Sequence, residues 1–173
     1  MIINTGGRTD TVQYYTEWLL HRFKEGYVLT RNPLFPGKVN QYELTPDKVD
    51  CVVFCSKNYK PILPRLNEIT DRFNTYFHYT ITAYGKDIEP GVPSIDESME
   101  TLAELSGMVG KQRIAWRYDP VFLTKEYTIE RHRETFGWMA AKLATYIDRC
   151  IFSFVEMYKT LEVIMPERLP LSE

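Results

Sequence analysis

The sequence has few cysteines, no long apolar run and no excess of charge of one sign. Its 173 residues include only three cysteines, Cys51, Cys55 and Cys150, with no CxxC pair. This small, odd set does not suit a disulfide framework, so we expect buried structural thiols and a reducing, cytoplasmic location. No basic-then-apolar leader begins the chain, and no apolar run approaches the roughly 18 residues of a membrane-spanning helix. A membrane partner is therefore not expected.

The charge is balanced, with 21 basic and 23 acidic residues. A nucleic-acid surface usually shows a basic excess, so the composition gives no strong signal for one, although a local basic pocket is compatible with it. The motifs GxGxxG, Walker A, GxSxG and HExxH do not occur. The chain is nevertheless 44% hydrophobic and 14% aromatic. These values predict a single globular domain over residues 1–173 with a substantial core.

Strand-like and helical segments alternate along the chain. We expect strands over residues 2–5, 27–30, 50–55, 76–83, 113–119 and 150–155. We expect helices over residues 11–25, 61–74, 94–109 and 128–147. The expected N-caps are Asp10 or Thr11, Ser94 or Asp96, and Thr128. Residues 35–50 contain Pro36, Gly37 and Pro46, so they are expected to be mostly loop, with a short strand near 39–44.

About six strands separated by helical segments predict an α/β protein with parallel βα units. The strands at 50–55 and 113–119 are apolar on both faces, as parallel sheets require. Two architectures fit this pattern, an incomplete TIM-like (β/α) barrel and an open doubly wound sheet. Because the glycine-rich nucleotide fingerprint is missing, we favour the incomplete barrel. An unclosed barrel would leave sheet edges, which a homo-oligomer could cover.

The expected strands turn polar at their carboxyl ends, where both architectures place a ligand site. The candidate ligand-binding residues are Arg8, Asp10, Lys57, Asn58, Tyr84, Arg117, Asp119 and Ser153. Period-two alternation places Arg117 and Asp119 on one face of their strand, and inward-facing tips would bring Lys57 and Tyr84 toward them. Arginine and lysine suit a carboxylate or phosphate, so we expect a small polar or anionic ligand. The Arg117–Asp119 pair taken alone could equally tie two loops together.

Catalytic residues are not assigned by the sequence. His21 and His132 are expected to face solvent or to cap helices, and His78 to be a core residue. Asp10 and Asp119 could form a general acid–base pair, although Asp10 suits a helix N-cap as well. Whether the protein is an enzyme therefore stays open at this point.

Several strand-end motifs carry a resemblance to a known family. They are GRTD (7–10), RNP (31–33), VVFCSKN (52–58), TITAYGKDIEPGVPS (80–94), WRYDPV (116–121), ERHRETFGWMA (130–140) and RCIFSFVEMY (149–158). In this order they resemble the N-terminal part of domain-of-unknown-function family 1848, which consists of uncharacterised, mainly bacterial proteins. The chain departs from the family at Gly7, where an arginine is usual, and at Cys55 and Ser56, where an aromatic residue and a threonine are usual.

The resemblance implies that relatives continue beyond the end of this chain, into a cysteine cluster near their C-terminus. Such a cluster on a βα-barrel body is similar to the radical S-adenosylmethionine and spore photoproduct lyase group. We therefore expect a truncated N-terminal part or a short homologue, with no cofactor of its own. An iron–sulfur cluster is expected only if a cysteine-rich C-terminal extension exists. Two functions stay open: the barrel part of such an enzyme with an anion-suited pocket, or a non-catalytic ligand-binding or interaction module.

Overall fold

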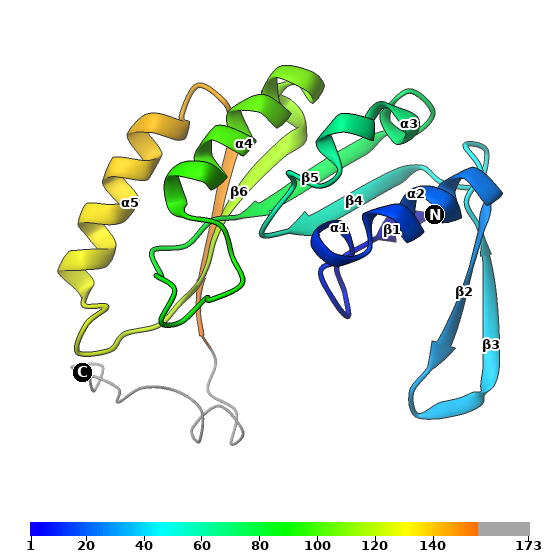
Figure 1. Cartoon of the computed structure of the whole chain (residues 1–173), viewed down its shortest axis with the longest axis horizontal. Coiled ribbons are helices and arrows are strands. Elements are labelled where there is room, and N and C mark those ends of the chain that lie inside the picture. The colour runs from blue at the N-terminus through cyan, green and yellow to red at the C-terminus, as the bar shows by residue number, and fades with distance from the viewer. Residues whose placement is uncertain (156–173) are drawn as a thin grey trace. The chain divides into compact units, whose positions relative to one another are not determined.

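A five-stranded parallel sheet is the main feature of the computed structural model, which describes residues 1–155. Across the sheet, the strands are β1 (Ile2–Asn4), β4 (Cys51–Ser56), β5 (Thr75–Thr80), β6 (Ile114–Val121) and β7 (Arg149–Phe154). Helices alternate with these strands along the chain (Figure 1), which confirms the α/β class and the βα units. The sheet has five strands rather than six, and the strands described here do not close into a barrel.

The chain divides into two compact units, Met1–His78 and the residues from Tyr79 onward. In the first unit, the core lies against β4 and β5. Phe54 and Phe77 are fully buried and stack with ring centroids 5.0 Å apart. Phe23 meets Phe73 edge-on at 5.2 Å. The single domain predicted over residues 1–173 stays a prediction.

The helical segments of the first unit are shorter than expected. The predicted helix over 11–25 is interrupted at Tyr15, whose φ of −137° is not helical, and it becomes α1 (Thr11–Tyr14) and α2 (Thr16–Glu25). Gly26 ends α2 with a φ of +80°, a conformation that glycine adopts without strain. The predicted helix over 61–74 is reduced to η1 (Leu63–Arg65) and α3 (Asn67–Thr70). Pro64 lies in this segment and cannot donate a helical hydrogen bond.

An antiparallel ribbon replaces the predicted second parallel strand. Strand β2 (Tyr27–Asn32) pairs with β3 (Phe35–Glu43), so the short strand expected near 39–44 is confirmed, but it begins earlier, at Phe35, where the sequence predicts loop. Only Pro33 and Leu34 separate the two strands, which is too short a link for a parallel crossover and suits a hairpin. The side chain of Asn32 supports the turn by accepting a 2.9 Å hydrogen bond from the backbone N–H of Leu34.

In the second unit, two longer helices begin where the sequence predicts. Ser94 forms a capping box with Glu97 at the start of α4 (Ile95–Val109), which is followed by η2 (Lys111–Arg113). Thr128 caps α5 (Ile129–Leu143). This helix stops at Leu143 rather than at residue 147, because the chain turns there and the N–H of Tyr146 donates to the Leu143 carbonyl.

The body of β6 is buried as its apolar sequence predicts. Ile114, Ala115 and Trp116 are fully buried, and the Trp116 ring stacks on Phe136 of α5 with centroids 5.1 Å apart. The indole N–H of Trp116 donates a 2.9 Å hydrogen bond to the carbonyl of Ile81. The strand continues through Pro120 to Val121 instead of ending before the proline, with a register shift against β7. None of the helices in residues 1–155 is long and apolar enough to cross a membrane.

Candidate functional site

Asp10 organises the polar carboxyl ends of β1 and β4 in the first unit. Its Oδ2 accepts hydrogen bonds from the Ser56 hydroxyl at 2.8 Å and from the Lys57 backbone N–H at 2.9 Å. Its Oδ1 accepts from the N–H of Gln13 at 2.9 Å and so caps α1. Both carboxylate oxygens are therefore engaged in holding two chain segments together. Asp10 has a clear structural role, and its predicted role in ligand binding stays a prediction.

Asn58 and Arg8 are the other candidates in the first unit. Asn58 exchanges hydrogen bonds with Ser56, so it joins the Asp10 group, and its own side chain accepts from the N–H of Lys60 at 3.0 Å. Arg8 instead turns toward the ribbon, where one terminal N–H donates to the carbonyl of Arg31 at 2.9 Å. The structure thus brings Asp10, Lys57 and Asn58 together and directs Arg8 elsewhere.

In the second unit, a chain of polar contacts joins Arg117 in the middle of β6, Asp119 nearer its carboxyl end and Ser153 near the carboxyl end of β7. One terminal nitrogen of Arg117 donates to Oδ2 of Asp119, and the Ser153 hydroxyl donates to Oδ1 of the same carboxylate. The Asp119 side chain is only 12% exposed, whereas that of Arg117 is 33% exposed. The Nε atom of Arg117 is buried and has no hydrogen-bond partner among residues 1–155. Arg117 is therefore fixed in place and still has unused donors.

Tyr84 is more buried than expected for a residue at the rim of a ligand pocket. It is 6% exposed, its hydroxyl donates to the Pro120 carbonyl at 2.8 Å and it accepts from the Phe122 N–H at 2.9 Å. Burial raises the pKa of Tyr84 above its usual value, so the phenol stays protonated. The side chain fixes the segment that follows β6, and its predicted contact with a ligand stays a prediction.

His132 is a central residue of the second unit, although the sequence predicts it to face solvent or to cap a helix. That prediction was wrong: His132 is 6% exposed. Its Nδ1 lies 2.8 Å from the Tyr118 hydroxyl and its Nε2 lies 3.1 Å from the Phe122 carbonyl. A carbonyl can only accept, so Nε2 carries the proton and the Tyr118 hydroxyl donates to Nδ1. Burial lowers the pKa of His132, which favours this neutral tautomer.

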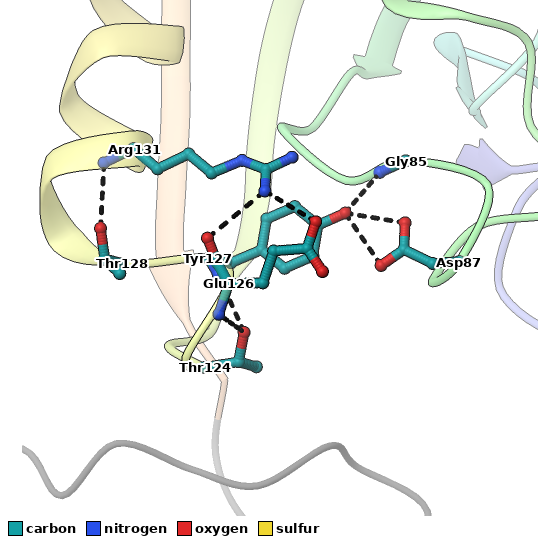
Figure 2. A network of polar contacts seen from close by, with 7 residues as sticks. All are labelled: Gly85, Asp87, Thr124, Glu126, Tyr127, Thr128 and Arg131. Carbon is teal, nitrogen blue, oxygen red and sulfur yellow. Dashed lines mark hydrogen bonds and ion pairs between the residues drawn. The ribbon is translucent and has the colours of Figure 1, made fainter.

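A second network that the sequence did not indicate surrounds Tyr127, as Figure 2 shows. The Tyr127 hydroxyl accepts from the N–H of Gly85 and donates to Asp87, both at 2.8 Å. The guanidinium of Arg131 lies 4.2 Å from the centre of the Tyr127 ring and donates to Glu126 at 2.9 Å. The loop over 83–95 and Arg131 border a small cavity of about 300 Å³ nearby. These contacts join α5 to the loop after β5.

The cysteines do not fit an iron–sulfur cluster. Cys51 and Cys55 lie in the same strand, and four residues of strand span roughly 13 Å, too far for two ligands of one cluster. Cys150 belongs to the other unit. In residues 1–155, no group of three or more histidine, cysteine, aspartate or glutamate side chains is placed to hold a metal ion. We therefore derive no chemistry from a cluster held by this chain.

The fold and these contacts define an α/β protein with a parallel sheet that carries polar side chains at its strand ends. The chain belongs to the family described as a domain of unknown function (DUF1848), whose family model matches residues 2–172. No curated protein and no solved structure matched the chain in the same comparisons. The family resemblance drawn from the strand-end motifs is thereby confirmed.

Proposed function

We propose that the carboxyl ends of β6 and β7 bind a small anion, a phosphate or a carboxylate, with Arg117 as its main contact. The observation that carries this proposal is the arrangement of Arg117, held on one side by Asp119 and partly exposed on the other. Asp119 is itself held by Ser153, so the arginine is pre-oriented. A planar guanidinium with unused N–H donors can bind a carboxylate or phosphate through two parallel hydrogen bonds.

The engaged carboxylates favour a binding module over an acid–base enzyme. Each oxygen of Asp10 and each oxygen of Asp119 accepts at least one hydrogen bond within the protein. A general base needs an oxygen within reach of a substrate proton, and at least one acceptor position of each of these oxygens is already used within the protein. A radical S-adenosylmethionine-like activity would need a cluster ligated by residues other than Cys51, Cys55 and Cys150, so it is the weaker proposal.

We also propose that the sheet is an incomplete TIM-like barrel in which β1 remains an edge strand. Once the β2–β3 ribbon is set aside, neighbouring strands are consecutive along the chain. A doubly wound sheet reverses its strand order and places its ligand at the reversal, and this sheet has no reversal among its described strands. In barrels the ligand lies at the carboxyl ends of the strands, and Asp119 and Ser153 lie toward that end of β6 and β7.

Titration of the protein with inorganic phosphate, sulfate and malonate, followed by backbone NMR, tests the anion proposal. We expect shifts at residues 117–119 and 153, and their loss in Arg117→Gln. Arg149 lies at the opposite end of β7 and is exposed, so Arg149→Gln is the matched control and should bind as the wild type does. An anion at a hundred times its Kd would add about 2.7 kcal/mol to the free energy of unfolding.

Three outcomes would decide against the anion site. The first is that no anion shifts any residue of the folded wild-type protein. The second is that Arg117→Gln binds as tightly as the wild type. The third is that the two glutamine variants weaken binding equally, which would indicate general charge screening. A folded Arg117→Gln that has lost binding, beside an unaffected Arg149→Gln, would support the site.

A further inference from the structure

A cleft of about 860 Å³ lies beside β1 in the first unit. Two runs of consecutive residues line it, residues 1–5 along β1 and residues 28–31 along β2. Further lining comes from α2, through Trp18 and Arg22, and from Tyr42 of β3. The volume lies in the range of ligand-binding clefts, and residues of β1, β2 and β3 form part of its border.

The strands that border this cleft have unpaired edges. Among the described residues, β1 pairs only with β4 and β2 pairs only with β3. The N–H of Thr5 donates to the Val53 carbonyl of β4 at 3.0 Å. In a parallel pair, alternate residues point their N–H and C=O groups toward opposite neighbours, so the backbone of Ile2 and Asn4 faces away from β4. Such an edge is a template for another strand.

The side chains around the cleft are apolar and cationic. Ile2 is 70% exposed, Leu29 54% and Trp18 48%, all of them large apolar residues on the cleft wall. Exposed apolar side chains gathered along one cleft are compatible with an interaction surface. Three arginines also line the cleft, and no aspartate or glutamate does. The three are Arg8, Arg22 and Arg31. The surface is therefore complementary to an acidic, partly apolar partner.

We propose that this cleft binds an extended polypeptide segment, which pairs with the open edge of β1 and alternates apolar with acidic side chains. Pairing with the edge would satisfy the outward backbone groups of Ile2 and Asn4. Side chains of a bound strand alternate between its two faces, so one set would pack on Trp18 and Leu29 while the other reached the arginines. This site lies in the first unit and does not depend on the anion site at β6 and β7.

The proposal is tested with the full chain and a fluorescein-labelled peptide of about six residues, the usual length of a strand. Valine and glutamate alternate in the first peptide. A second peptide replaces glutamate with lysine, and a third is the first with every backbone amide N-methylated, so that neither of its edges can donate. Binding is measured by fluorescence anisotropy. We expect the glutamate peptide to bind at least about tenfold more tightly than the lysine peptide, and N-methylation to abolish binding.

A charge-reversed variant makes the test specific to the cleft. Arg31 is exposed in the ribbon, so Arg31→Glu should leave the fold intact. It should weaken the binding of the glutamate peptide and strengthen the binding of the lysine peptide. Arg149→Glu, in the other unit, is the matched control and should not change either affinity. Three results would overturn the proposal: no peptide binding, equal binding of the N-methylated peptide, or an Arg31→Glu variant indistinguishable from the control. Binding of anilinonaphthalene sulfonate without any peptide binding would identify a small amphipathic anion as the occupant instead.

Discussion

The hydrogen bond between Tyr118 and His132 is the contact whose removal we expect to destabilise the second unit most clearly. Tyr118→Phe deletes only the hydroxyl that donates to Nδ1 of His132 over 2.8 Å. Burial raises the pKa of Tyr118 to about 12, so this hydroxyl is a donor at every pH at which the protein is handled. The ring keeps its neighbours, because Trp116 and Phe136 contact its carbon atoms.

The magnitude follows from the burial of the group left behind. His132 is 6% exposed and Tyr118 is 4% exposed, so water cannot easily replace the missing donor. An unsatisfied buried acceptor costs about 1–3 kcal/mol. In a protein of this size each kcal/mol lowers Tm by roughly 2–4 °C, so Tm should fall by roughly 2–12 °C. Tyr14→Phe is the control, because Tyr14 is 61% exposed and its change should stay within about 0.5 kcal/mol.

Urea unfolding followed by circular dichroism measures both variants, and a double-mutant cycle with His132→Leu isolates the pair. If the hydrogen bond exists as described, the two substitutions are not additive, because either one alone removes it. The reasoning would be refuted by a Tyr118→Phe variant as stable as Tyr14→Phe. It would also be refuted by strict additivity of Tyr118→Phe and His132→Leu.

Three further expectations concern pH, a close backbone contact and a helix cap. Burial lowers the pKa of His132 in the folded protein. The contribution of His132 to the free energy of unfolding is therefore present above its unfolded pKa near 6.5 and is lost as the pH falls through the folded pKa. His132→Gln should remove this contribution to the pH dependence of urea unfolding. A Cβ on Gly6 would lie 2.6 Å from both Cβ and O of Cys55, so Gly6→Ala should lower the free energy of unfolding by about 1–3 kcal/mol, whereas Gly7→Ala, with nothing within 4 Å, should not. Ser94→Ala should cost about 1 kcal/mol in the same assay, and an unchanged midpoint would count against the cap.

The sequence predicts β4 and β6 well because apolar residues on both faces of a strand leave a strong signal. Residues 50–55 and 113–119 are short apolar runs, and they become β4 and β6. Strands over 27–30 and near 39–44 are also expected from the sequence, but their antiparallel pairing could not be found in this way. Every residue of β3 is exposed, and Pro36 and Gly37 lie inside it. The two strands of the ribbon are defined by their backbone pairing across a two-residue turn. The spacing of apolar residues in the sequence does not predict such pairing.

The roles of individual polar residues were harder to predict than their positions. In the sequence Asp10 suits a helix N-cap, a ligand contact and a catalytic group, and only the contacts with Ser56 and Lys57 show how fully it is engaged. The sequence predicts that His132 faces solvent or caps a helix. Its burial depends on Tyr118 and on the Phe122 carbonyl, and no local pattern encodes contacts between residues so far apart.

Acidic and basic residues at the strand ends have different uses in this protein. The carboxylates of Asp10 and Asp119 are engaged through both oxygens with groups of the protein itself. The guanidinium groups of Arg8 and Arg117 each donate to one acceptor within residues 1–155, and each has several N–H groups. Asp10 therefore fixes the backbone, and Asp119 orients Arg117. The unused N–H groups of Arg8 and Arg117 can select a ligand that carries oxygen acceptors.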